Sequence, residues 1–147
     1  MSAKGSMLAG LVQWVHVAAA VIGIGGMGFL LLILLPSLRI LSPEQRDVLL
    51  KRVMGRYRWV SWSMIILLIA SGLGNVRLWA WDAPWGAYWK WLTVKIVLAF
   101  LVFTIALALT IPLKFLGWFR ARRQLWLAIA FALGLVVILL SAYLRRA

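Results

Sequence analysis

The chain contains no cysteine, one histidine (His16) and three acidic residues among its 147 positions. The lack of cysteine excludes disulfides, iron–sulfur clusters and thiolate metal sites. The three acids, Glu44, Asp47 and Asp82, all fall in predicted loops or at predicted helix ends. A di-metal carboxylate site and a buried carboxylate proton relay are therefore excluded, because both need acidic side chains inside the protein.

Charge is scarce as well: charged residues make up 13% of the chain and hydrophobic residues 65%. Soluble domains contain about 25% charged residues. The composition therefore predicts a polytopic integral membrane protein, and the length allows a single domain, 1–147. Lys4 is followed by an apolar run longer than the h-region of a signal peptide, so we expect a retained helix there.

Four apolar segments are long enough to span a membrane: residues 8–35, 59–81, 89–116 and 125–144. At about 1.5 Å per residue, each can cross roughly 30 Å of hydrocarbon as an α-helix. The connections between the last three segments are short, which favours antiparallel neighbours. The predicted fold is all-α, an antiparallel bundle of four transmembrane helices.

The second helix is expected to begin before its membrane span. Ser42, Pro43 and Gln45 occupy the N-cap, first-turn proline and N3 positions that are typical of a capping box. Apolar residues then recur at helical spacing between positions 49 and 57. This pattern predicts a cytoplasmic amphipathic extension whose basic side chains reach anionic headgroups. A docking surface for a partner protein is the alternative interpretation.

The net charge of +13 could indicate nucleic-acid binding, but the position of the charges argues against it. Ten Lys and Arg side chains flank the first and third predicted loops, and five flank the termini and the second loop. Cytoplasmic loops carry the excess of positive residues. Loops one and three are therefore predicted to be cytoplasmic, with both termini and loop two periplasmic at a bacterial inner membrane. The expected partners are the bilayer with its anionic headgroups and other membrane subunits or a second copy, with no nucleic acid.

His16 lies inside the first apolar segment, about 12 Å below its outer end. An ionisable residue inside a membrane span is a candidate functional site. Ser71, Asn75 and Arg77 fall in the last turns of the second span. Lys95 falls in the first turns of the third span. All five side chains are therefore expected in the outer half of the bundle.

Three interpretations of His16 stay open on the residues alone. On a helical wheel it shares a face with Ala19, Ala20, Gly23 and Met27. These small residues allow another helix to approach, with His16 bonded across to a serine, an asparagine or a backbone carbonyl. The same space would admit a haem with His16 as its axial ligand. Copper or proton handling is the third possibility.

Two further residue types bear on these alternatives. Lys95 either extends to the outer headgroups or pairs with an anionic group such as a propionate. A copper path needs several Met or His ligands, and Met27 and Met64 are the only methionines in the predicted spans. Copper transport therefore has little support in the residue inventory.

Short motifs along most of the chain resemble the copper-resistance D (CopD-like) integral membrane family. They are Trp14-x-His16 followed by alanines and Gly25-Gly26, Arg56-x-Arg58, Ser71-Gly72-Leu73, and Trp85-Gly86 followed by Leu92-x-x-Lys95. The His and Lys pair on the first and third helices is also similar to the HemJ-type protoporphyrinogen oxidases. The resemblance implies a haem- or copper-associated bundle with His16 as the candidate axial ligand and Lys95 beside it.

We therefore expect a CopD-like protein that binds haem b in the outer half of the bundle and serves electron transfer or a membrane redox complex. The predicted cofactor-binding residues are His16, Lys95, Asn75 and Arg77, and the metal ligands are His16 with Met27 as a further candidate. A non-catalytic accessory subunit of a larger membrane complex is the first alternative, and copper transport or resistance is the second. No catalytic residue is expected in the chain itself.

Overall fold

The computed structural model describes residues 3–82 and 85–144, which form helices joined by short turns and contain no strand. Within these residues, four helical stretches are long and apolar enough to cross a membrane: Gly5–Ile40, Pro43–Leu78, Ala87–Thr110 and Arg123–Leu144. The prediction of an all-α chain with four helices long and apolar enough to span a membrane is confirmed for these residues. Arg145 and Arg146, which contribute to the predicted charge asymmetry, lie outside the described residues.

The first stretch continues past its predicted end at residue 35. The reason is a widened π-helical turn, in which the Leu35 N–H bonds the carbonyl of Leu30. Pro36 lacks an N–H, and its ring crowds the carbonyl of the preceding turn, so a wider turn lets the helix pass this position. The stretch is assembled from α1 (Ala3–Phe29), η1 (Leu30–Leu34), α2 (Leu35–Ser37) and η2 (Leu38–Ile40).

The second stretch, α3 (Pro43–Asn75) with η3 (Val76–Ala80), begins at the predicted capping box. The Gln45 N–H donates to Ser42 Oγ at 3.4 Å, and the Ser42 N–H donates to Gln45 Oε1 at 3.3 Å. This helix start is confirmed. The 33 residues of α3 span about 50 Å, so the predicted extension and the membrane span are one continuous helix.

The third stretch, α4 (Ala87–Thr110), ends earlier than the predicted limit at 116. Pro112 disfavours the helical conformation at the residue before it, and Ile111 is extended with φ −77° and ψ 126°. Pro112 therefore ends this span shortly after Thr110. Two short helices, η4 (Lys114–Leu116) and α5 (Gly117–Ala121), then lead to the long α6 (Arg123–Leu144).

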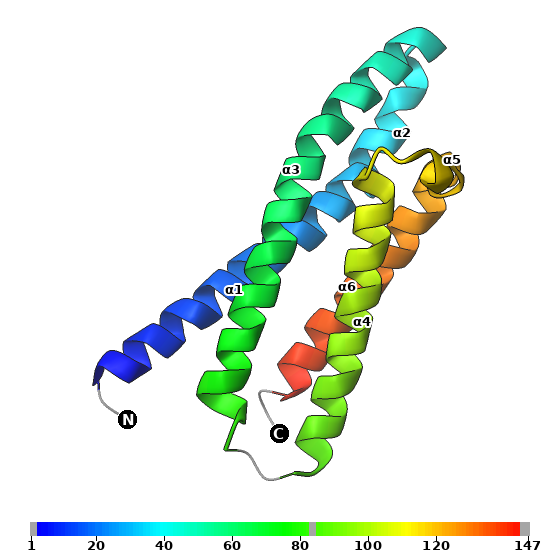
Figure 1. Cartoon of the computed structure of the whole chain (residues 1–147). Coiled ribbons are helices and arrows are strands. Elements are labelled where there is room, and N and C mark those ends of the chain that lie inside the picture. Colours follow the sequence, from blue (N-terminus) through cyan, green and yellow to red (C-terminus); the bar gives the residue numbers. More distant parts are fainter. Residues whose placement is uncertain (1–2, 83–84, 145–147) are drawn as a thin grey trace.

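The four long helices associate mainly as two pairs. α1 packs along α3 and α4 packs along α6, whereas α1 with α6 and α3 with α4 share smaller contacts. Figure 1 shows the turn after η2 and the turn around α5 at one end of the molecule, with the turn between η3 and α4 at the opposite end. We call the half next to α5 the inner half and the opposite half the outer half.

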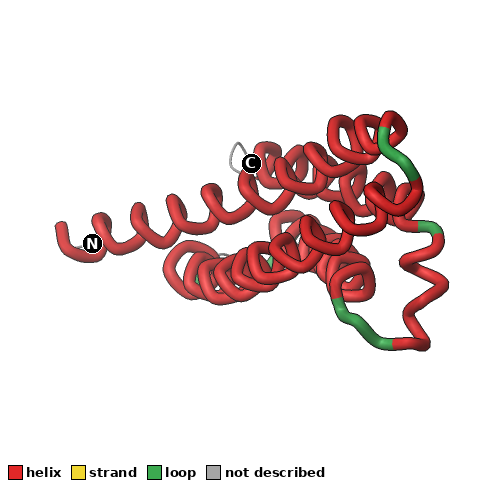
Figure 2. The backbone as a smooth tube through the Cα atoms, turned by 90° about the horizontal axis from the view of Figure 1, so that it is seen from above, coloured by secondary structure: helices red, strands yellow, loops and turns green. Residues whose placement is uncertain are grey.

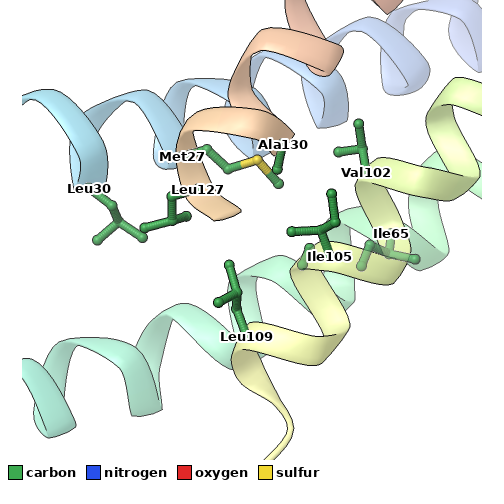
Figure 3. Packing of buried hydrophobic residues seen from close by; sticks show 9 residues of the cluster. Met27, Leu30, Ile65, Val102, Ile105, Leu109, Leu127 and Ala130 are labelled. Carbon is green, nitrogen blue, oxygen red and sulfur yellow. The ribbon is translucent and has the colours of Figure 1, made fainter. Parts of the chain in front are cut away.

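The hydrophobic core occupies the inner half and draws on all four long helices. Figure 3 shows Met27 directed toward Leu127 and Ala130, with α4 residues closing the cluster from the other side. In the outer half, the N-terminal part of α1 diverges from α4 and α6 in Figure 1 and extends beyond the other helices in Figure 2. The core cluster is made of Met27, Leu30, Ile65, Val102, Ile105, Ala106, Leu109, Leu127 and Ala130.

Candidate functional site

His16 lies in a seam between α1 and α3. A Cβ built on Gly23 would lie 3.7 Å from Met64 Cβ, and one built on Gly26 would lie 3.2 Å from Tyr57 Cε2. The two backbones therefore approach closely along small residues, at the alternating three- and four-residue spacing of helices that cross at a shallow angle. The α1 residues in contact with α3 are Val12, His16, Gly23 and Gly26, and the buried Ala9 and Ala19 continue the same spacing along α1.

A hydrogen bond of 2.9 Å joins His16 Nδ1 to Ser71 Oγ across this seam. Ser71 is 6% exposed, and His16 is half-buried. A Cβ on the neighbouring Gly72 would lie 3.5 Å from His16 Cε1, so the imidazole is also in van der Waals reach of the α3 backbone. The interpretation of His16 as bonded across to a serine is confirmed for this nitrogen.

The direction of the bond determines the tautomer of the imidazole. The Ser71 hydroxyl has one proton, which it donates to the carbonyl of Leu67 one turn earlier in α3. Ser71 Oγ must then accept from His16, so we assign the proton of the neutral imidazole to Nδ1. Nε2 consequently carries the lone pair, as it does in histidines that bind a metal while a second group fixes the ring.

Asn75 lies one turn beyond Ser71 on α3 and is half-buried. Its Oδ1 atom is shielded from solvent and has no hydrogen-bond partner among the described residues. A buried carbonyl oxygen without a donor costs about 1–3 kcal/mol. In the outer half, the imidazole of α1 therefore meets a buried hydroxyl of α3, and an unsatisfied amide oxygen lies one turn further along α3.

Lys95 and Arg77 lie at the same depth on different helices. Trp62 Nε1 donates to Thr110 Oγ1 at 3.0 Å, which fixes the register of the antiparallel helices α3 and α4. Counting the same number of residues outward from Trp62 along the second helical stretch and from Thr110 along α4 leads to Arg77 and Lys95, so these two residues lie at the same level. Lys95 is half-buried and Arg77 is exposed.

Arg77 is turned away from the His16 seam. It lines a recess of about 480 Å³ together with Leu73, Val76 and Trp81. Leu73 is two residues after Ser71, which places it about 200° around the helix from the seam. Of the predicted cofactor-binding residues, His16 lies in the seam and Asn75 lies one turn beyond its partner Ser71, whereas Arg77 lies on another face of α3.

Met27 does not join His16. It follows His16 by eleven positions, about 16 Å along the helix axis, and is 6% exposed within the core cluster. Its thioether packs against apolar side chains of the inner half (Figure 3). Across residues 3–82 and 85–144, no three His, Asp or Glu side chains are grouped closely enough to hold a metal ion.

Ser71 is the functional candidate that the predicted site residues omit. Its signal in the sequence is the spacing of α3, where Tyr57, Met64 and Ser71 recur every seven positions. The same heptad places the partners of Gly26, Gly23 and His16 on one face of α3. The spacing identifies the face, but only the pairing of α1 with α3 shows which serine meets the imidazole.

The donor set bears on which group could bind here. Haem iron can be held by one protein imidazole with its sixth position open, and an imidazole such as that of His16 is the donor type this needs. Copper sites combine several imidazole or sulfur ligands, and Met27, the predicted second ligand, is buried elsewhere. The outer seam fits a haem iron better than copper.

Compared with known proteins, the chain matches no family model, no curated protein and no solved structure. Its function is therefore inferred from its own residues.

Proposed function

We propose that this chain is a CopD-like membrane protein that binds haem b in the outer half, with His16 Nε2 as the axial ligand. The observation that carries the proposal is the hydrogen bond between His16 Nδ1 and Ser71 Oγ. It holds the ring in one orientation and leaves the nitrogen lone pair on the opposite edge. A second group that fixes a ligating histidine is a regular feature of metal sites in proteins.

The other polar residues have supporting roles in this proposal. Ser71 orients the imidazole through its hydrogen bond with Nδ1. Lys95, half-buried on α4, supplies a positive charge for a propionate. Asn75 offers a buried amide near the seam. Bound haem supplies one-electron chemistry, which suits electron transfer or a membrane redox complex.

The membrane topology is part of the same proposal. The four long helices form an antiparallel bundle in a bacterial inner membrane, with the inner half toward the cytoplasm and both termini periplasmic. The basic residues of the first and third connections support this orientation, because positive charges are retained on the cytoplasmic side. The outer seam then faces the periplasmic side of the membrane.

A visible absorption spectrum tests the proposal directly. Protein expressed with haem supplementation and purified in a mild detergent should show a Soret band that shifts on reduction with dithionite. His16→Ala should remove most of the bound haem, whereas Gln13→Ala, one turn away on α1, should retain it. A folded, haem-replete preparation of the unaltered chain without a Soret band would contradict the proposal.

A second candidate function is that of an accessory subunit in a larger membrane complex. The observation that favours it is the divergence of the N-terminal half of α1, which leaves Trp14 68% and Val21 62% exposed. A partner helix would cover this face. Native gel electrophoresis of solubilised membranes should then show the chain in an assembly with other proteins, and migration as a lone monomer or dimer would contradict it.

A further inference from the structure

A second polar site lies in the inner half, away from His16. A cavity of about 420 Å³ opens between α3 and the segment that leads from α4 to α6. Its walls carry four basic side chains and one acid, Asp47, which is exposed. The basic side chains are Lys51, Arg58, Arg120 and Arg123. The lining is therefore strongly positive, with Leu50, Met54 and Leu109 among its apolar members.

Two of these arginines present buried donors without acceptors. The Nε atoms of Arg58 and Arg123 are shielded from solvent and have no hydrogen-bond partner within the described part of the chain. A buried charged donor without a partner is strongly unfavourable. Two such donors on the walls of one cavity indicate that a negatively charged group completes the site.

Surrounding contacts hold Arg58 and Arg120 in place. The guanidinium carbon of Arg58 lies 5.8 Å from the ring centroid of Trp62, whose indole is hydrogen-bonded to Thr110. Arg120 donates to the carbonyl of Leu113 at 2.8 Å, which ties it to the turn after α4. The cavity wall is therefore built by three different segments and does not depend on one flexible side chain.

The cavity also lies at a defined level of the molecule. The apolar stretches Ala87–Thr110 and Arg123–Leu144 end and begin at its edge. The register of α3 and α4 brings Arg58 close to the same level as Thr110. This is the level at which a membrane-spanning helix meets the headgroup region, where phosphate groups are abundant.

We propose that this cavity is a binding site for a phosphate-bearing anion, held by the guanidinium groups of Arg58 and Arg123. Arginine suits phosphate because its planar donors match two oxygens at once. The phosphate belongs either to the headgroup of an anionic lipid or to a soluble phosphate compound. The site is independent of haem binding at His16 and stands whether or not that proposal holds.

Binding to the purified full chain tests the proposal in three arms: inorganic phosphate, phosphatidylglycerol in mixed micelles and phosphatidylcholine in mixed micelles. Native mass spectrometry measures the bound fraction, and thermal unfolding measures the stabilisation. Specific binding of phosphatidylglycerol alone assigns the site to a lipid headgroup, and binding of inorganic phosphate assigns it to a soluble anion. Equal binding of both lipids without phosphate binding, or no binding in any arm, overturns the proposal.

Matched variants locate the site. Arg58→Gln and Arg123→Gln should each weaken binding by about tenfold or more, since each removes a charge-assisted hydrogen bond. Arg122→Gln is the matched control, because it removes one positive charge directly beside Arg123. Arg122 lies over the Trp118 ring and is not part of the cavity lining. This variant should leave binding unchanged. Equal weakening by all three variants would show general electrostatic attraction and overturn the proposal.

Lysine variants keep the test valid where a glutamine variant fails to fold. Arg58→Lys and Arg123→Lys retain the positive charge but lack the planar pair of donors. Each should elute as folded protein on size exclusion and bind the anion several-fold more weakly than the unaltered chain. Binding equal to that of the unaltered chain would overturn the assigned role of the two guanidinium groups.

Discussion

The inner and outer halves of the molecule are packed in different ways. In the inner half, four helices share one apolar core around Met27, Leu109 and Leu127. In the outer half, α1 has α3 as its main neighbour, and the contact is a narrow seam of small residues with one polar link, His16 to Ser71. The inner half is held by the fit of apolar side chains, whereas the outer half combines a looser fit with polar groups.

This difference has a physical reason in a membrane. Lipid tails are as apolar as leucine, so no hydrophobic force drives helices together there, and close van der Waals fit and hydrogen bonds replace it. The inner half has that fit, because Gly28 lies directly against the Phe131 ring and Gly134 against Ile24. The outer half has fewer contacts of this kind and is the part of the structure better able to admit a ligand or a partner.

The largest expected effect is a cavity in the inner core. Leu127 is 2% exposed, and Leu127→Ala should lower the free energy of unfolding by about 2–3 kcal/mol, because the surrounding helices cannot collapse into the space. Tryptophan fluorescence during unfolding by dodecyl sulfate in mixed micelles measures the change. Leu135→Ala on the same helix, where the side chain is 48% exposed, is the control and should change the value by less than about 0.5 kcal/mol.

The next effect compares close glycine contacts in the two halves. A Cβ on Gly28 would lie 2.9 Å from Phe131 Cε2, and one on Gly74 would lie 3.0 Å from Val12 Cγ1. Gly28→Ala should destabilise by about 1–2 kcal/mol, because α1 is confined there by α6. Gly74→Ala should cost less, because the outer part of α1 can shift away from α3.

Gly25→Ala is the baseline for this pair, since nothing lies within 4 Å of the position that its methyl group would occupy. This variant should raise the free energy of unfolding by about 1 kcal/mol, because only the higher helix propensity of alanine acts there. The same dodecyl sulfate titration measures all three variants. Equal destabilisation by Gly28→Ala and Gly74→Ala would show that the outer seam is as rigid as the inner core.

The helices themselves follow from local patterns in the sequence. Apolar runs identify the four spans, Ser42 and Gln45 identify the start of α3, and Pro112 identifies the end of α4. Pro36 is the exception, because a π turn carries the helix past it to Ile40. Such a turn redistributes hydrogen bonds over several residues, and no residue type in Leu30–Leu34 specifies it.

The candidate sites are less predictable because they depend on pairing between helices. The wheel places His16 on a small-residue face, but the contact with Ser71 depends on how α1 and α3 are aligned. The cavity in the inner half is even less predictable from the sequence. Arg58 and Arg123 are typical loop-flanking charges in the sequence, and only the folded arrangement, in which α3 and the start of α6 line the same cavity, brings their buried Nε atoms to one site.

The smallest expected effect concerns the two hydrogen bonds that join helices in the two halves. A double-mutant cycle with His16→Ala and Ser71→Ala should give a coupling energy of about 0.6 kcal/mol, the average for such bonds in membranes. The reference is the bond between Trp62 and Thr110, tested with Trp62→Phe and Thr110→Val. Thr110 follows the core residue Leu109, so the tight packing of the inner half holds this bond in place and its coupling should be larger, about 1 kcal/mol.

The order of the two coupling energies tests the comparison between the halves. If the His16–Ser71 coupling in haem-free protein equals or exceeds the Trp62–Thr110 coupling, the outer bond is a main determinant of stability. Its role in orienting His16 would then be secondary. A weaker outer coupling means that His16 contributes little to holding α1 against α3, so stability alone does not explain a histidine at this depth of the membrane.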